Sequence, residues 1–138
     1  MCNYTDSPVT APASETASIQ AYLTGNNLTA TALPSGVYYK ITQTGTGAAI
    51  ANLCSNVTVK YVGKLTNGTV FDQTPTGATA VFPLGKVIVG WQKGLPLISA
   101  GGKITLYIPP SLGYGNSSVG VIPPNSILIF DIELVGVS

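Results

Sequence analysis

The chain has 138 residues, of which 45% are hydrophobic and 8% charged, and its formal net charge is +1. This length and apolar content predict one folded domain with one core, and they exclude a disordered, self-repelling chain. The six basic residues are all lysines and histidine is absent. These absences exclude Ser-His-Asp and Cys-His catalysis, His-ligated zinc, and bidentate recognition of phosphate or guanine by arginine, so we expect no nucleic-acid partner.

The N-terminal 35 residues divide into a tail and a helical segment. Residues 1–13 are rich in Thr, Ser, Pro and Ala without hydrophobic periodicity, which predicts a flexible tail. Ser14 is a suitable N-cap, Glu15 complements the positive helix end, and Gly25 is a stop signal. The apolar residues at helical spacing between them are Ile19, Tyr22 and Leu23. Residues 14–35 are thus a predicted helix and linker whose apolar stripe docks on the main domain, with peptide binding or dimerisation as the alternative.

From Gly36 onward the hydrophobic pattern changes to period two, in runs rich in β-branched and aromatic residues. The predicted strands cover residues 37–42, 57–62, 80–84, 103–108 and 126–135. Asn67 and Gly68 stand between two strand-like flanks, and both tolerate the positive φ angles of a type I′ turn, so a hairpin is predicted there. The sheet is expected to be mostly antiparallel.

One segment departs from the strand pattern. Trp91, Leu95 and Ile98 recur at i, i+4 and i+7, which predicts one short helix. Pro96 is tolerated about one turn from a helix start. A helix packed across a curved sheet gives an α+β architecture.

Two carboxylates, Asp131 and Glu133, are close enough in sequence to suggest a catalytic pair. At i and i+2 on a strand they share one face, while Phe130, Ile132 and Leu134 occupy the other. This amphipathic pattern favours two solvated charges over a glycosidase dyad.

The two cysteines, Cys2 and Cys54, lack the CxxC spacing of a metal or redox site and the density of a disulfide scaffold. We therefore do not expect them to define the fold. The longest apolar stretches, such as residues 127–137, contain charges and are shorter than the roughly 18 residues of a membrane span.

Five fragments, taken together, resemble the FKBP-type peptidyl-prolyl isomerases, the macrolide-binding immunophilins. They are residues 57–63 (VTVKYVG), 68–72 (GTVFD), 82–91 (FPLGKVIVGW), 113–115 (GYG) and 122–134 (IPPNSILIFDIEL). Their type, order and spacing fit the family over residues 36–136, and they agree with the independent prediction of strands and helix. Residues 36–138 are accordingly predicted to form the isomerase domain.

The resemblance implies a five-stranded antiparallel sheet wrapped around one short helix, with an aromatic pocket between them. Trp91 would form the pocket floor, Asp72 and Tyr114 would be polar groups at the rim, and the Ile88 backbone N–H would bind a ligand carbonyl. The implied apolar walls are Tyr61, Phe71, Val87, Ile88, Ile122 and Phe130. The catalytic set is then Tyr61, Phe71, Asp72, Trp91, Tyr114 and Phe130, and the substrate-binding set is Val87, Ile88 and Ile122. No metal or cofactor is implied.

Each position also has a structural interpretation without function. From periodicity alone, the Trp and Phe residues of this set are ordinary core side chains. Tyr61 and Tyr114 could be strand or loop tyrosines with exposed hydroxyls, and Asp72 could be a turn residue that bonds its own backbone. The family resemblance is what favours functional roles for these residues over purely structural ones.

The sequence departs from the family pattern in three places. Ala80 stands where many members have an aromatic wall residue, and residues 73–79 lack the arginine that often braces the pocket aspartate. Both changes weaken the expected macrolide affinity. The connection over residues 84–88 is two residues shorter than in minimal eukaryotic members, which resembles the microbial branch with an N-terminal extension.

The predicted activity is cis/trans isomerisation of X-Pro bonds in unfolded or flexible chains, as a monomeric folding helper. The alternatives are a non-catalytic module that binds proline-containing partners or acts as a chaperone, and a structural surface protein. Cys2 followed by a polar tail resembles the mature start of a bacterial lipoprotein, which predicts a location in the cell envelope facing the periplasm. An incidental cysteine and a cytoplasmic location are the alternatives.

Overall fold

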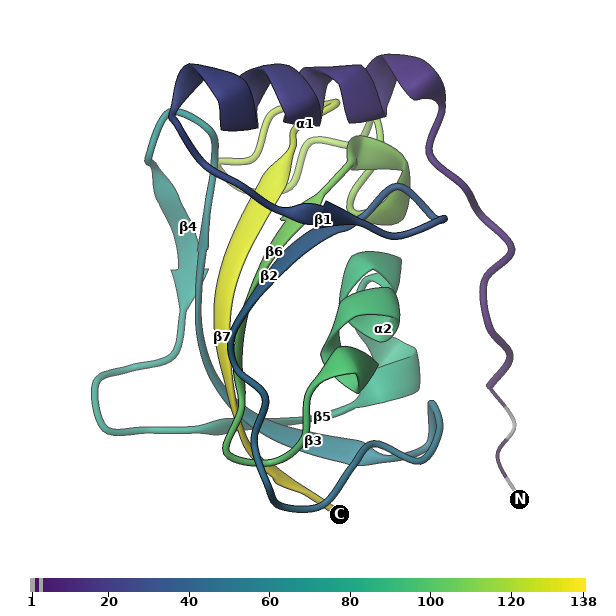
Figure 1. The fold of residues 1–138 in the computed structure, drawn as a ribbon, viewed down its shortest axis with the longest axis vertical. Coiled ribbons are helices and arrows are strands. Elements are labelled where there is room, and N and C mark those ends of the chain that lie inside the picture. The colour runs from purple at the N-terminus through teal and green to yellow at the C-terminus, as the bar shows by residue number, and fades with distance from the viewer. Residues whose placement is uncertain (1, 3) are drawn as a thin grey trace.

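The structure is a computed structural model that describes residue 2 and residues 4–138. An antiparallel sheet curves around a short helix, and a longer helix lies across one end of the sheet (Figure 1). The sheet order is β1-β2-β6-β7-β3-β4, and β5 also pairs with β3. The strands are β1 (Thr31–Ala32), β2 (Tyr38–Gln43), β3 (Asn56–Lys64), β4 (Val70–Gln73), β5 (Ala80–Pro83), β6 (Lys103–Ile108) and β7 (Leu128–Val137). The helices are α1 (Ala13–Gly25), α2 (Val89–Gly94) and the 3₁₀ turns η1 (Leu84–Lys86), η2 (Leu95–Leu97) and η3 (Pro110–Leu112).

Strand β7 lies in the middle of the sheet and is hydrogen-bonded to β6 and β3. Its inward side chains Phe130, Ile132 and Leu134 are buried in the main core, as their period-two spacing predicts. Asp131 and Glu133 point to the other face, where Asp131 accepts a 2.6 Å hydrogen bond from the Thr105 hydroxyl. The sheet has seven strands where the resemblance implies five, and of these the two-residue β1 is the one that was not predicted, since β4 belongs to the predicted hairpin and β5 to the predicted strand at residues 80–84.

The N-terminal helix covers part of the outer face of the sheet. Ile19 and Leu23 of α1 pack with Tyr38, Tyr107 and Ile129 in a second buried cluster. The docking predicted from the apolar stripe is therefore what the structure shows. The predicted N-cap is wrong, because α1 starts at Ala13, before Ser14, and the preceding residue is a proline without a side-chain cap.

The predicted β3–β4 hairpin is present with a different turn. Gly68 N–H bonds the Leu65 carbonyl, and Leu65 N–H bonds the Thr69 carbonyl. Gly68 alone in this loop has positive φ, at 89°. This is the three-residue loop with a glycine bulge in place of the predicted two-residue type I′ turn, and the Asn67 side chain supports it by accepting a bond from Thr69 N–H.

The single predicted helix over residues 91–98 is interrupted. Helix α2 ends at Gly94 and the chain continues as the 3₁₀ turn η2, which contains Pro96. A proline ring clashes with the carbonyl four residues earlier, so the α-helix cannot continue through it. Ile98 is extended yet 2% exposed, because the turn still delivers it to the core.

The N-terminal segment differs from the predicted flexible tail, as far as residues 2 and 4–13 are described. A disulfide joins Cys2 to Cys54, and Lys93 Nζ donates a 2.9 Å hydrogen bond to the Ser7 carbonyl. Further along, Ala11 N–H bonds the Ser35 carbonyl and Ala11 itself is buried. The segment therefore runs along the domain past α2 (Figure 1). Hydrophobic periodicity does not report a disulfide or hydrogen bonds to backbone groups, which is why the sequence did not predict this attachment.

The disulfide also corrects two inferences from the cysteines. The pair does tie distant parts of the chain together, and the sulfur of a disulfide-bonded Cys2 is not free to form the thioether of a lipid anchor. Within the described part of the chain, no helix is both long and apolar enough to cross a bilayer.

Candidate active site

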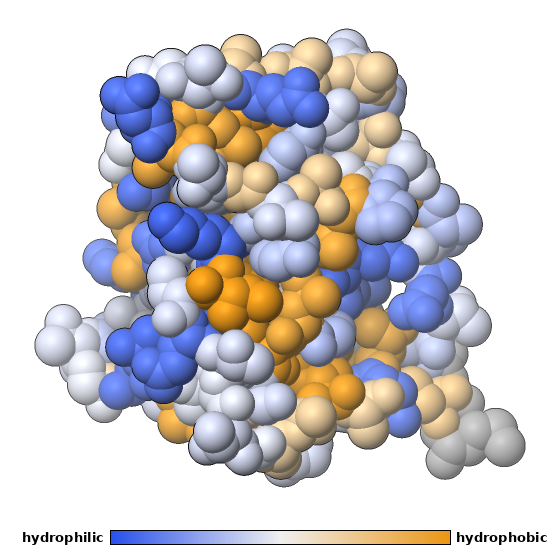
Figure 2. Space-filling model, viewed as in Figure 1, coloured by the Kyte–Doolittle hydropathy of each residue, from blue (hydrophilic) through white to orange (hydrophobic). Residues whose placement is uncertain are grey.

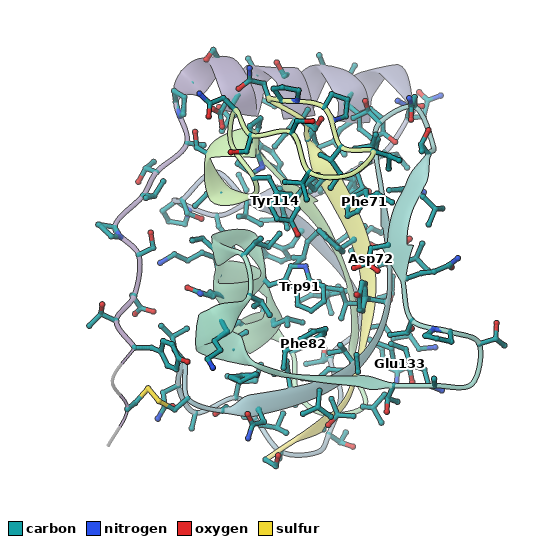
Figure 3. The ribbon with its side chains drawn as sticks, turned by 180° about the vertical axis from the view of Figure 1, so that it is seen from behind. Phe71, Asp72, Phe82, Trp91, Tyr114 and Glu133 are labelled. Atoms are coloured by element: carbon teal, nitrogen blue, oxygen red, sulfur yellow. A yellow bond between two sulfur atoms is a disulfide. The ribbon has the colours of Figure 1, made fainter. Side chains whose placement is uncertain are left out.

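A cavity of about 290 Å³ lies between α2 and the concave side of the sheet. Figure 2, which views the molecule from the side opposite to Figure 3, shows hydrophobic residues near the middle of that other face, with hydrophilic residues around them. The cavity is lined by Tyr61, Asp72, Phe82, Lys86, Val87, Ile88, Trp91, Tyr114 and Phe130. These residues come from β3, β4, β5, η1, α2, β7 and the connections around them, so the site forms only when the whole domain is folded.

Trp91 forms the centre of the aromatic lining. Its ring meets those of Tyr61, Phe82 and Phe130 in T-shaped contacts, with centroid distances of 5.1, 5.9 and 5.2 Å. Such edge-to-face packing is the favoured geometry of aromatic pairs. The indole nitrogen is buried without a hydrogen-bond partner among the described residues. The indole N–H is thus an unsatisfied donor in the described structure, and the aromatic rings around it give the floor its apolar character.

The rim is polar and centres on Asp72. The Tyr61 hydroxyl donates a 2.6 Å hydrogen bond to Asp72 Oδ2. Burial, followed by the bond to Asp72 and the negative charge of Asp72, raises the pKa of Tyr61 above that of a free tyrosine. The pKa of Tyr114 is also raised, first by burial and then by the charge of Asp72. Both hydroxyls consequently keep their protons at neutral pH and can act as hydrogen-bond donors.

The connection over residues 84–88 forms the edge of the cavity beside α2. The Gln92 side-chain amide donates to the carbonyls of Gly85 and Val87, at 3.3 and 3.0 Å. Ile88 is the N-cap of α2 with φ −58° and ψ 152°. Backbone bonds of the described residues give the Ile88 N–H no acceptor. An N–H at a helix start that is free of internal bonds can bind a carbonyl of a ligand.

Seven of the predicted site residues line the cavity together: Tyr61, Asp72, Val87, Ile88, Trp91, Tyr114 and Phe130. Phe71 and Ile122 do not line it. Phe71 lies behind the wall, against Phe130 at a centroid distance of 5.4 Å, and Ile122 is 4% exposed in the core. Figure 3 shows Trp91 between Tyr114 and Phe82, with Phe71 and Asp72 on the β4 side.

Sequence reasoning missed Phe82 and Lys86. Phe82 lies two residues after Ala80 on β5, so the two side chains share one face of the strand. Phe82 thus gives the cavity wall an aromatic ring two residues after Ala80, at the next position of β5 that faces inward. The period-two pattern contains this signal, because the face assigned to Ala80 also includes Phe82.

A wider hollow of about 370 Å³ lies on the outer face of the sheet. Its charged lining residues, Lys60, Lys103, Asp131 and Glu133, come from neighbouring strands. In the sheet register Lys60 and Lys103 flank Glu133 on both sides. Cross-strand neighbours of opposite charge stabilise a solvated sheet face, so this hollow is explained without a ligand.

Comparison with known proteins identifies close relatives. Residues 47–135 match the family described as FKBP-type peptidyl-prolyl cis-trans isomerase. The isomerase FkpA of Buchnera aphidicola is 49% identical over 104 residues, which is 75% of this chain and 41% of that protein. The outer membrane protein MIP of Legionella longbeachae is 47% identical over 107 residues, 76% of this chain and 46% of that protein.

The fold is similar to solved structures as well. The crystal structure of FkpA from Escherichia coli superimposes with a TM-score of 0.81 at 39% identity, covering 91% of this chain and 60% of that one. The chain thus spans less than half the length of the two relatives matched by sequence.

Proposed function

The chain belongs to the family of FKBP-type peptidyl-prolyl cis-trans isomerases, and from this premise we propose that it accelerates cis/trans rotation about X-Pro bonds in flexible polypeptides. The observation that carries the proposal is the aromatic cavity over Trp91, with the Ile88 N–H and the Tyr114 hydroxyl at its edge. Proline-containing polypeptides are the proposed substrates, and the role is that of a folding helper.

The reaction suits a site without histidine. Rotation of an X-Pro amide faces a barrier of about 18–20 kcal/mol, because resonance of the C–N bond is lost at the perpendicular state. No covalent bond breaks and no proton has to move. The planar amide is more dipolar than the twisted one, so an apolar environment stabilises the twisted state relative to the planar state.

The lining residues divide this task between them. The proline ring would rest on the indole of Trp91, whose T-shaped contacts hold it in place. The Ile88 N–H and the Tyr114 hydroxyl would bind flanking carbonyls, which fixes one side of the amide while the other side rotates. Asp72 would hold the Tyr61 hydroxyl and, through its charge, keep the rim phenols protonated.

The test is to remove the Ile88 N–H. Proline fits this position, because φ is −58° at Ile88 and the preceding Val87 is extended. Ile88→Pro should lower kcat/KM at least about tenfold, the loss expected for one hydrogen bond that holds the fixed side of the amide. Ile88→Val keeps the N–H and is the matched control, with kcat/KM close to that of the parent chain.

The assay is NMR exchange spectroscopy on a Leu-Pro peptide. Acceleration of exchange by the parent chain supports the isomerase, whereas shift changes without acceleration would identify the alternative, a proline-binding module. Equal rates for Ile88→Pro and Ile88→Val would contradict the role of the N–H.

For macrolide inhibitors, we propose weak binding. Ala80 removes an aromatic wall residue of the family pattern, and Phe82 replaces it only from the next inward position of β5. Restoring the wall with Ala80→Phe should tighten macrolide binding in a titration, and an unchanged affinity would argue against this account.

We also propose a location in the bacterial cell envelope. The Cys2–Cys54 disulfide supports it, since disulfides persist in oxidising compartments. The relative from Legionella longbeachae is named as an outer membrane protein. Fractionation of cells that produce the native gene product would test this, and recovery with the cytoplasmic fraction would refute it.

A further inference from the structure

One carboxylate of the N-terminal helix binds the loop that carries Tyr114. Glu15 Oε1 accepts a 2.9 Å hydrogen bond from Ser111 N–H, and Glu15 Oε2 accepts a 2.6 Å bond from the Ser111 hydroxyl. The two residues are 96 positions apart in the chain. Glu15 also lies outside the part of the sequence that matches the isomerase family, residues 47–135.

Ser111 stands at the start of a short turn whose end places Tyr114. In η3 the carbonyl of Pro110 accepts bonds from the N–H groups of Gly113 and Gly115, at 3.0 and 2.8 Å. Leu112, inside the same turn, is fully buried. These bonds fix the backbone on both sides of Tyr114 relative to Ser111. A group that holds Ser111 in place therefore also holds the backbone that carries the Tyr114 side chain.

The helix end of this link is itself firmly attached. Ile19 is fully buried in the cluster beneath α1, and Leu23 is 6% exposed there. The Gln20 amide donates a 2.7 Å hydrogen bond to the Tyr38 hydroxyl. Glu15 is half-buried in the first turn of this anchored helix. The backbone that carries the Glu15 carboxylate is thus held in place, and the two bonds from Ser111 hold the carboxylate itself.

The loop itself needs such support. After Tyr114, residues 116–121 are all exposed, and Tyr114 is 37% exposed. Loops with few buried contacts sample alternative positions easily. A hydroxyl that must meet a substrate carbonyl within hydrogen-bond distance loses effect when its backbone shifts by even about 1 Å.

We propose that Glu15 is a positioning residue of the isomerase site, which acts through Ser111 to hold the Tyr114 hydroxyl at the cavity rim. The inference rests on the proposed function. The N-terminal helix is on this account a working part of the active site, although none of its residues lines the cavity.

The experiment is a double-mutant cycle on kcat/KM for the Leu-Pro peptide. Glu15→Ala should lower kcat/KM about three- to tenfold, in line with a loss of charge-assisted hydrogen bonds and of orientation. Ser111→Ala retains its N–H and should lower it less, and Glu15→Gln, which can still accept from Ser111 N–H, should restore most of the activity. Ser18→Ala, exposed on the same helix, is the control for α1, and Ser118→Ala is the control for the loop.

The decisive measurement is the effect of Glu15→Ala on kcat/KM in a chain that already carries Tyr114→Phe. If Glu15 acts by placing the hydroxyl, Glu15→Ala should change kcat/KM less than about twofold once that hydroxyl is gone, because effects through one group are not additive. A general loss of structure would instead lower activity equally in both backgrounds, and that result overturns the inference. If Glu15→Ala does not fold, Ser111→Ala carries the same comparison, because its smaller loss of kcat/KM should likewise vanish in the Tyr114→Phe background. Absence of acceleration by the parent chain would refute the proposed function itself, which is a separate outcome.

Discussion

At the scale of single residues, the rim concentrates two phenols around one carboxylate. Tyr61 donates to Asp72, and the charge of Asp72 also acts on Tyr114. An anion next to a phenol opposes loss of the phenol proton, and burial opposes it too. Both effects move the pKa of Tyr61 and Tyr114 upward, away from neutrality.

This arrangement predicts a flat pH profile. A phenol whose pKa lies above its reference value of about 10 stays neutral throughout the neutral range, and the proposed rotation transfers no proton. We expect kcat/KM on a non-titrating Leu-Pro peptide to vary less than about twofold between roughly pH 6 and pH 8.5. Exchange spectroscopy over this range is the measurement. A bell-shaped profile near neutrality would require a catalytic acid or base and would refute the mechanism.

Wall and rim residues should respond differently to truncation. Phe130 is 3% exposed and packs on both Trp91 and Phe71, so Phe130→Ala should cost about 3–5 kcal/mol of unfolding free energy as well as activity. Asp72 is exposed on β4, and Asp72→Ala should lower kcat/KM with little change in melting temperature. Calorimetry measures both variants. Equal thermal losses would remove the distinction between wall and rim.

At the scale of elements, β3 shows how closely Phe130 of the cavity wall and Phe71 behind it approach the sheet. A Cβ added at Gly63 would lie 2.7 Å from Cε1 of Phe130 and 2.7 Å from Cζ of Phe71. Both rings belong to the tight aromatic cluster, so neither can move without disturbing the other. The absence of a side chain on β3 at this point is what allows the wall to form.

Gly63→Ala should therefore destabilise the protein by about 1–3 kcal/mol, the usual cost of overpacking, and lower kcat/KM through displaced wall rings. Gly25→Ala is the matched control, because a Cβ at Gly25 meets nothing within 4 Å. Its unfolding free energy should be unchanged or slightly higher. Denaturant titration with a parallel exchange assay separates the two effects. If the two variants had similar unfolding free energies and kcat/KM values, the rings near Gly63 would have moved aside without loss of stability, which would contradict this account.

The strands and helices also show which parts of the fold could be predicted from the sequence. The period-two pattern predicted β6 at residues 103–108 as observed, because Ile104, Leu106 and Ile108 alternate along the strand on the face that is buried in the main core. Other features of the fold depended on contacts that periodicity does not contain. The break at Pro96 was expected to be tolerated, and nothing in a sequence states that Cys2 lies near Cys54 or that Glu15 reaches Ser111. All nine predicted site residues rested on the family resemblance, and seven of them line the cavity, whereas Phe82 stood in a quoted fragment, residues 82–91, without being assigned to the site.

At the scale of the whole molecule, the N-terminal segment is a strap fixed at both ends. The disulfide holds its start and α1 holds its end, with the Lys93 bond to Ser7 between them. The ring of Tyr4 lies against Gly85, in the connection that leads to Ile88. Figure 3 shows the disulfide at the edge of the molecule, away from Trp91.

Breaking the disulfide should lower stability without abolishing the fold. The cross-link spans 52 residues, for which the chain-entropy relation gives about 4 kcal/mol. Denaturant titrations with and without a reductant should show a lower midpoint in the reduced sample. Cys54→Ser should have that lower midpoint in both conditions. Coincident curves for the parent chain would mean that the cross-link contributes nothing to stability.

The position of β7 has a consequence for how the protein is made. Strand β7 lies in the middle of the sheet, between β6 and β3. Residues 56–64 therefore cannot pair with their main partner before residues 128–137 have been synthesised. During synthesis from the N-terminus, the first half of the chain consequently emerges with its central pairing surface unoccupied. Folding through such distant pairs is slow, in the range of milliseconds to seconds. Until β7 has been released, a nascent chain of this kind therefore exposes unpaired strand edges, which favour aggregation.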